Sequence, residues 1–166
     1  MAQTIIGRER EINQLEAIVA SGKAELVAIY GRRRIGKTFL VKEFFKNKFD
    51  FYATGIFEGR KADQLTAFND ALNQNSKKPI PKAQTWMQAF MQLRDYLSSL
   101  KKQRLIVFLR SEEHTSELQS HRFISFLLYL VFQNHSNALR NWLARVSNQG
   151  NSSRKTIRRC FLRLDR

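Results

Sequence analysis

Apolar positions along the first 109 residues follow two different patterns. Continuous apolar runs at 24–30 and 104–109, with a shorter one at 49–53, are typical of buried β-strands. Apolar residues that recur every three or four positions predict amphipathic helices, which are expected at 12–19, 37–48, 61–73 and 86–100. Two prolines within a polar cluster predict a loop at 75–82. Strands that alternate with helices indicate an α/β fold, built on a parallel, doubly wound sheet with flanking helices.

The junction between the first strand and the second helix carries a chemical motif. Residues 31–38 read Gly-Arg-Arg-Arg-Ile-Gly-Lys-Thr and match G-x-x-x-x-G-K-[ST] at every position. Glycines allow successive backbone N–H groups to turn inward around phosphates, while Lys37 reaches the β and γ phosphates and Thr38 offers a hydroxyl to Mg²⁺. The sequence therefore predicts a site for ATP and Mg²⁺, with these binding residues: Gly31, Arg32, Arg33, Arg34, Ile35, Gly36, Lys37 and Thr38. The alternative is a surface turn that matches the motif by accident.

Length and composition favour a globular protein of ordinary size. A chain of 166 residues with 43% hydrophobic content can bury one core, so a single domain is expected. The single cysteine, Cys160, excludes an internal disulfide and fits a reducing compartment. The N-terminus lacks the apolar core of a signal peptide, and the longest apolar run, 123–132, is about half of what a membrane-spanning helix needs. The cytoplasm is the expected location, without membrane association.

The net charge of +15 leaves a second class of function open. Such an excess is typical of proteins that bind nucleic acid or an anionic surface. The charge is, however, spread along the chain, and the densest cluster, 32–34, already lies in the phosphate-binding motif. A basic nucleic-acid-binding module without catalysis remains an alternative, and the oligomeric state is not predicted.

Several motifs occur together in the order that a known family requires. Residues 6–9 read Ile-Gly-Arg-Glu, the phosphate motif follows an Ile-Tyr pair, and an apolar strand occupies 105–109. Residues 1–109 thus resemble the N-terminal part of an AAA+-like P-loop ATPase, of the prokaryotic family often called archaeal-type ATPases. The resemblance implies ATP hydrolysis in the parent protein, with Lys37 stabilising phosphate charge. It also implies that Gly7 and Arg8 lie near the adenine, although a helix-start turn without ligand contact would explain them equally well.

The sequence departs from this family directly after the strand at 105–109. The family pattern has an Asp that orders Mg²⁺ and a Glu that polarises the attacking water, but Arg110 and Ser111 stand there instead. An arginine at about 5 Å from a cation costs about 3 kcal/mol for each pair of unit charges at an effective dielectric of about 20. Glu112 and Glu113 lie beyond the strand in the wrong register. We therefore expect weak nucleotide binding and no hydrolysis; a regulator that binds nucleotide without cleaving it is an alternative.

A second resemblance begins at the same position. Residues 110–120 read Arg-Ser-Glu-Glu-His-Thr-Ser-Glu-Leu-Gln-Ser, which is similar at all eleven positions to the translation of a widely used sequencing-library adaptor. We interpret 1–109 as the N-terminal part of a P-loop ATPase domain and 110–166 as a non-native tail, of which 121–166 is unassigned. The sheet would then be incomplete, the strand at 24–30 would lie at its edge, and the apolar run at 123–132 would be exposed.

Overall fold

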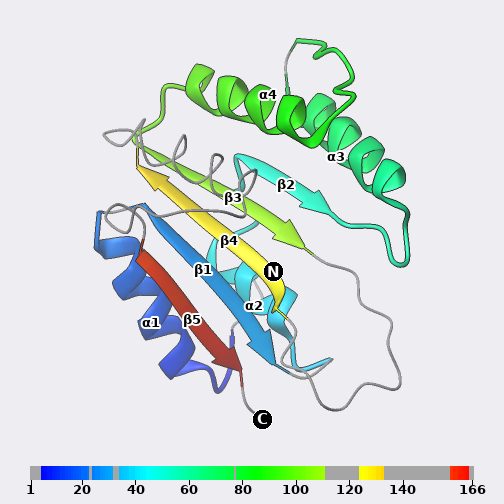
Figure 1. The fold of residues 1–166 in the computed structure, drawn as a ribbon. Coiled ribbons are helices and arrows are strands. Elements are labelled where there is room, and N and C mark those ends of the chain that lie inside the picture. The colour runs from blue at the N-terminus through cyan, green and yellow to red at the C-terminus, as the bar shows by residue number, and fades with distance from the viewer. Residues whose placement is uncertain are drawn as a thin grey trace.

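A computed structural model describes residues 5–22, 24–31, 34–76, 78–110, 124–132 and 158–164. These residues form a mixed α/β domain in which helices flank a five-stranded sheet (Figure 1). In chain order the elements are α1 (Glu9–Ala20), β1 (Glu25–Gly31), α2 (Lys37–Phe44), β2 (Phe51–Thr54), α3 (Lys61–Asn75), α4 (Trp86–Ser99), β3 (Arg104–Arg110), β4 (Ile124–Phe132) and β5 (Arg158–Leu164). None of the helices in the described part of the chain has the length and apolar character needed to cross a membrane.

The sheet has the strand order β2-β3-β4-β1-β5 and is mixed (Figure 1). The β1–β5 and β2–β3 pairs are parallel, as predicted, whereas β4 runs antiparallel to both of its neighbours, β1 and β3. The prediction of a wholly parallel sheet is therefore wrong for β4. Mixed sheets of this kind are common in α/β folds, because each strand needs only a hydrogen-bonding neighbour on either side.

The strand that leads into the phosphate motif lies inside the sheet and not at its edge. Glu25 of β1 is level with Leu130 of β4 on one side and with Arg158 of β5 on the other. The predicted edge position is thus wrong, because segments 124–132 and 158–164 pair with the backbone of β1 along both sides. The apolar run at 123–132, which we expected to be exposed, contributes β4 to the middle of the sheet.

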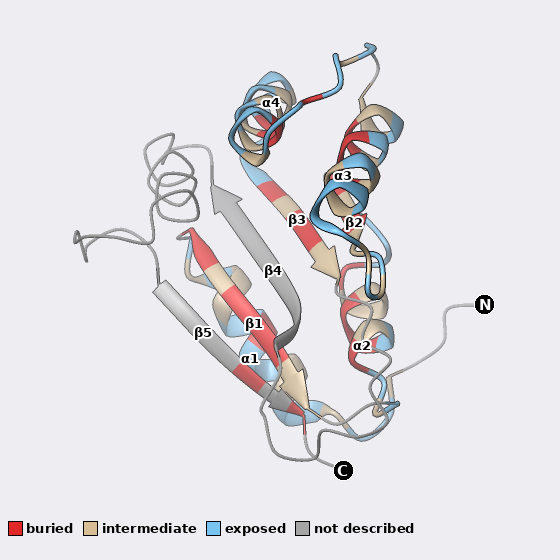
Figure 2. Cartoon of the chain, turned by 45° about the vertical axis from the view of Figure 1, so that its right-hand side comes forward, coloured by how far each residue is buried: buried red, intermediate tan, exposed pale blue. Residues whose placement is uncertain are grey.

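Two hydrophobic clusters lie on opposite faces of the sheet. Helices α1 and α2 contribute Leu15, Leu40 and Val41 to one cluster, which includes Val27 and Ile29 of β1. Helices α3 and α4 contribute to the other, which covers β2 and β3. Buried residues on these two helices face the strands while exposed residues face outward (Figure 2). The alternating side chains of the strands therefore contact helices on both faces.

Helix α2 ends earlier than the apolar spacing indicates. The prediction placed its end at residue 48, but the helix ends at Phe44, and Lys46 and Asn47 adopt positive φ angles of 51° and 54°. Phe45 is nevertheless buried and packs with Phe44 in an edge-to-face contact. The apolar pattern thus continues through a turn that buries aromatic rings without helical backbone.

The predicted loop at 75–82 is held against α3 by two asparagines one helical turn apart. The side chain of Asn69 accepts from the N–H of Ala83 and donates to its carbonyl, at 3.2 and 3.0 Å. Asn73 makes the same pair of bonds with Ile80: it accepts from the N–H at 2.7 Å and donates to the carbonyl at 3.1 Å. The two amides satisfy loop backbone groups that no strand pairs, which orders this connection between α3 and α4.

A buried carboxylate joins the starts of β2 and β3. Asp50 is 9% exposed and accepts hydrogen bonds from the backbone N–H of Ile106 at 2.8 Å and from the ammonium of Lys102. The hydrogen bond with Asp50, and then the charge of that carboxylate, raises the pKa of Lys102. The hydroxyl of Tyr96 lies 3.0 Å from the Asp50 carbonyl, and burial is the main cause that raises the pKa of this phenol. Asp50 therefore connects both strands to α4.

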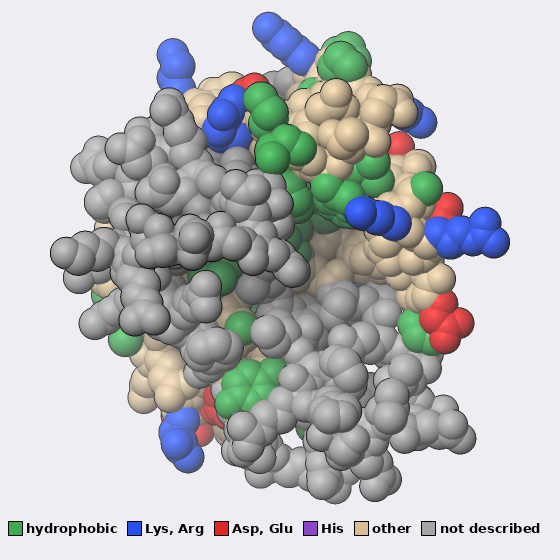
Figure 3. Space-filling view, in the orientation of Figure 1, with side chains coloured by type: hydrophobic (Ala, Val, Ile, Leu, Met, Phe, Trp, Pro, Cys, Tyr) green, Lys and Arg blue, Asp and Glu red, His purple; other side chains and the backbone are tan. Residues whose placement is uncertain are grey.

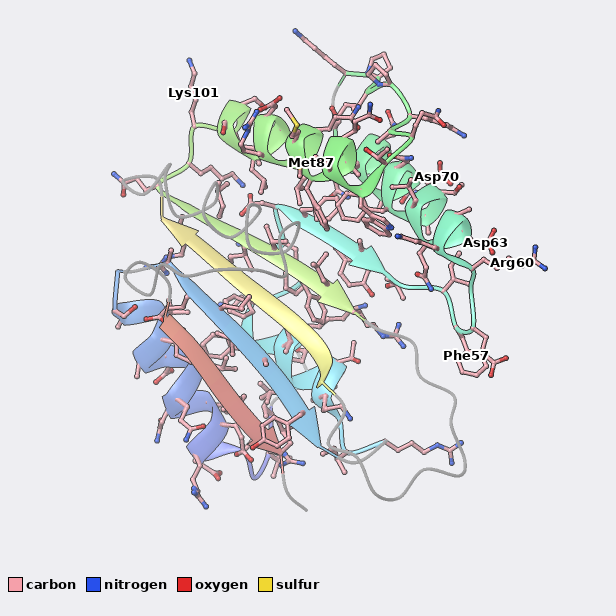
Figure 4. The ribbon with its side chains drawn as sticks, in the orientation of Figure 1. Phe57, Arg60, Asp63, Asp70, Met87 and Lys101 are labelled. Atoms are coloured by element: carbon pink, nitrogen blue, oxygen red, sulfur yellow. The ribbon has the colours of Figure 1, made fainter. Side chains whose placement is uncertain are left out.

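Replacing Asp50 by Ala is expected to lower the free energy of unfolding by about 2 kcal/mol, because the part-buried Ile106 N–H would lose its acceptor. Asp50→Asn keeps one acceptor oxygen and should lose less. Asp70→Ala is the matched control, since Asp70 is exposed and projects from α3 (Figure 4). Urea denaturation followed by circular dichroism measures all three. Equal stability of Asp50→Ala and Asp70→Ala would contradict the role given to Asp50.

Candidate functional site

Four strands end at the same edge of the sheet. Strands β1, β2, β3 and β5 run in one direction, since β4 is antiparallel to both β1 and β3. Their carboxyl ends, Gly31, Thr54, Arg110 and Leu164, therefore lie along one edge. In open α/β sheets, ligands bind outside the carboxyl ends of the strands.

The phosphate motif forms the turn between β1 and α2 at this edge. Arg34 and Gly36 have positive φ angles of 62° and 81°, so the backbone turns sharply before the helix begins. Ile35 packs against the α1–α2 cluster, whereas Arg34 is exposed. The predicted ligands Arg32 and Arg33 lie outside the described residues. The motif thus takes the strand–turn–helix form that its sequence predicts.

Gly36 is the N-cap residue of α2 and has no side chain with which to cap the helix. The first amides of a helix lack partners within the helix, so they can donate to an anion that also meets the positive end of the helix dipole. A Cβ built on Gly36 would have no atom within 4 Å, which leaves open space beside the turn. Thr38 lies half-buried in the first helical turn, one residue after Lys37.

Lys37 points back across the turn instead of outward. It is 8% exposed, and its ammonium donates to the Gly31 carbonyl at 2.8 Å. Burying an ammonium is costly unless polar partners surround it, and the Gly31 carbonyl is one such partner. Of the predicted phosphate ligands, the structure brings Gly31, Gly36 and Lys37 together around one turn.

Arg8 contacts the phosphate motif from a distant part of the sequence. Its guanidinium donates to the Ile35 carbonyl at 3.0 Å and to the Glu11 carboxylate at 3.1 Å. The neighbouring Gly7 is exposed, with a φ of 72°. The sequence identified Gly7 and Arg8 only through a resemblance, and it missed both the contact with Ile35 and the role of Glu11 as the partner of Arg8. The Arg–Glu spacing of three residues at a helix start was the available signal for Glu11.

Arg110 lies at the same edge of the sheet as the phosphate turn. The strand register aligns Arg110 with Phe126 of β4, and Phe126 with Ile29 of β1, so Arg110 and Ile29 are separated by about 10 Å across two strand spacings. Strand alternation directs Arg110 to the same face as Phe108, the face that α2 covers. Its Nε atom is buried. The positively charged side chain of Arg110 therefore stands at the strand end where the family has a carboxylate that orders magnesium.

Two acidic residues beyond β3, Glu112 and Glu113, are the candidate substitutes for the missing pair. They lie outside the described residues, as does Ser111. Within the described ranges, no group of three His, Cys, Asp or Glu side chains is placed to hold a metal ion. Among these residues, the Thr38 hydroxyl is the predicted oxygen ligand for a cation beside the phosphate turn.

One family model matches most of the chain, and one known protein matches a short part of it. The family model described as an ATPase domain predominantly from Archaea matches residues 5–144, a stretch that includes Arg8, the phosphate turn and Arg110. An uncharacterized ATP-binding protein of Methanocaldococcus jannaschii, MJ0423, is 46% identical over 43 residues, which cover 26% of this chain and 73% of that protein. No solved structure matches the chain.

Gly31→Ala is expected to destabilise the protein more than Gly36→Ala. A Cβ on Gly31 would lie 2.5 Å from the Leu164 carbonyl oxygen and 2.7 Å from the Ile35 side chain, whereas one on Gly36 meets open space. Both positions have positive φ, so each variant also carries a backbone strain on the order of 1–3 kcal/mol. Urea denaturation separates this shared strain from the clash. Equal losses in the two variants would show that β5 does not lie against Gly31.

Proposed function

The chain belongs to the family of ATPase domains found predominantly in Archaea, and from this membership we propose that it binds ATP at the turn formed by residues 31–38. The matched relative carries the name of an ATP-binding protein, which supports the same ligand. The observation that carries the proposal is the buried ammonium of Lys37, held inside a turn that ends at an uncapped helix start.

The residues of the turn fit a triphosphate. The ammonium of Lys37 can neutralise the β and γ phosphates, and the first amides of α2 can donate to their oxygens. Gly36 has no side chain to fill the space beside these amides. Each of these features favours a multiply charged anion over a neutral ligand, because a buried ammonium and a helix dipole gain most from opposite charge.

We further propose that this chain holds ATP without hydrolysing it. Mg²⁺, when bound, would supply positive charge beside the phosphates, and Thr38 is the residue that would hold it. Arg110 stands at the strand end where the family has a carboxylate, and two positive charges near each other oppose metal binding. Among the described residues, no carboxylate follows β3 to orient an attacking water. The proposal is therefore that the chain keeps the phosphate-binding residues Gly31, Gly36 and Lys37 but lacks the carboxylate that the family has after this strand.

The origin of residues 110–120 is a separate proposal, which rests on their identity with a translated adaptor at eleven positions. It concerns where this segment came from and not whether β4 and β5 pair with β1. The underlying nucleotide sequence decides it, since codons that differ widely from the adaptor would contradict an adaptor origin.

Binding of nucleic acid through the net charge of +15 is less well supported. On the face seen in Figure 3, the Lys and Arg side chains of the described residues are scattered and do not gather in one patch. Recognition of a nucleic-acid backbone requires basic residues clustered along a face or groove. DNA affinity that falls steeply with salt and ignores ATP would favour this alternative.

Lys37→Ala is expected to weaken ATP binding by at least about tenfold, because a charge-assisted hydrogen bond to phosphate is lost. Lys48→Ala removes an exposed lysine just beyond the same helix and should bind like the parent chain. Titration calorimetry with ATP measures both. Release of inorganic phosphate from ATP and Mg²⁺ should stay at background in every variant. Turnover that Lys37→Ala abolishes would contradict the absence of hydrolysis.

Arg110→Asp is expected to make ATP binding respond to Mg²⁺. The substitution removes a repelling charge and supplies the oxygen ligand that a hard cation prefers, so Mg²⁺ should raise the affinity of this variant about tenfold more than that of the parent chain. Arg110→Gln removes only the repulsion and should lie between the two. ATP titrations in EDTA and in Mg²⁺ measure the response. An equal effect of Mg²⁺ on ATP affinity in the parent chain and both variants would contradict the proposal that Arg110 lies close to the metal site.

A further inference from the structure

We infer that Arg8 is a positioning residue for the phosphate turn, which it acts on through the peptide between Ile35 and Gly36. The inference rests on the proposed ATP binding and deepens it. It assigns Arg8 to the recognition of the phosphate chain, whereas the family resemblance suggested the adenine side.

The contacts of Arg8 are well placed for this role. One terminal nitrogen of the guanidinium, Nη1, donates to Glu11, and the other, Nη2, donates to the Ile35 carbonyl. The side chains of Arg8 and Glu11 are only 19% and 15% exposed, so the ion pair is largely shielded from water. Glu11 lies on α1, whose inner face packs in the same cluster as α2. The guanidinium is therefore anchored on one helix and reaches the turn that begins the other.

The geometry of a peptide unit transmits this contact to the site. A trans peptide is planar, so its carbonyl and its N–H point in opposite directions. With the Ile35 carbonyl held toward Arg8, the N–H of Gly36 points away from Arg8. Because glycine readily adopts many backbone conformations, a peptide beside Gly36 needs an outside contact to keep one orientation. Arg8 supplies that contact.

Lys37 makes a similar contact at the other end of the turn, where its ammonium binds the Gly31 carbonyl. Two cationic side chains thus hold two carbonyls of the turn, those of Gly31 and Ile35. A site arranged in advance loses less conformational entropy on binding, so affinity for the phosphate chain should depend on both contacts.

The test compares ATP with inorganic tripolyphosphate, which has the phosphates and no base. We expect Arg8→Ala to weaken binding of both ligands by the same factor, about five- to twentyfold. Arg8→Lys keeps one donor and should recover part of the loss, and Glu11→Gln, which loosens the anchor, should show a smaller loss than Arg8→Ala. Arg10→Ala removes the same charge from an exposed position on α1 and serves as the matched control.

A second measurement reports on the peptide without any nucleotide. In ¹H–¹⁵N spectra of the free protein, the Gly36 amide should shift and exchange faster with solvent in Arg8→Ala, but not in Arg10→Ala. Thermal unfolding checks that each variant is folded; if Arg8→Ala is not, Arg8→Lys and Glu11→Gln carry the same comparison.

Loss of ATP affinity with unchanged tripolyphosphate affinity would overturn the inference in favour of a base contact. An unchanged Gly36 amide would overturn it as well. If neither ligand binds the parent chain, or if Lys37→Ala binds as well as the parent chain, the proposed function fails, and the Gly36 amide still decides whether Arg8 orients the turn.

Discussion

Backbone pairing along both sides of β1 is the constraint on which the site depends. The strand delivers the phosphate turn to the edge of the sheet, and its two neighbours, β4 and β5, fix where that edge lies. With its hydrogen bonds satisfied and Val27 and Ile29 buried beneath α1 and α2, β1 provides a rigid base for Gly31. The turn beyond it can then hold strained backbone angles that a mobile strand end would relax.

Positively charged side chains lie at the carboxyl edge of the sheet. Lys37, Arg8 and Arg110 bring positive charge toward this region, and the Glu11 carboxylate accepts a hydrogen bond from Arg8. In an ATPase, cationic side chains and a metal share the neutralisation of the phosphates. Among the described residues at this edge, cationic side chains are present and no group of three acidic, His or Cys side chains is placed to hold a metal ion.

Local sequence patterns predicted most of the helices and strands and the turn between β1 and α2. They did not predict contacts between residues far apart in the sequence. The apolar periodicity located β1, α3, α4 and β3 to within a few residues, because each buries one face against a neighbour. The motif located the turn, because glycine and lysine at that spacing are typical of a loop between a strand and a helix. The end of α2 was missed, since Phe45 and Phe49 continue an apolar pattern through residues that leave the helix.

The direction of β4 and the contact between Arg8 and Ile35 have no local signal. A strand's orientation depends on the path of the chain that precedes it, and its own residues pack equally well in either direction. Arg8 and Ile35 are separated by a helix and a strand, so only the packing of α1 near α2 brings them together.

The close approach of Gly31 to the Leu164 carbonyl has a consequence for biosynthesis. The wall behind the first glycine of the turn comes from β5, a segment that leaves the ribosome long after β1, α1 and α2. The N-terminal elements can acquire helical and strand structure early, but the turn after β1 takes its final shape only when β5 docks. A nascent chain arrested before that point would present the lysine and glycines of the motif without the strand that lies against Gly31. Under the proposed function, ATP would then stabilise the finished domain late and would not act as an early template for its folding.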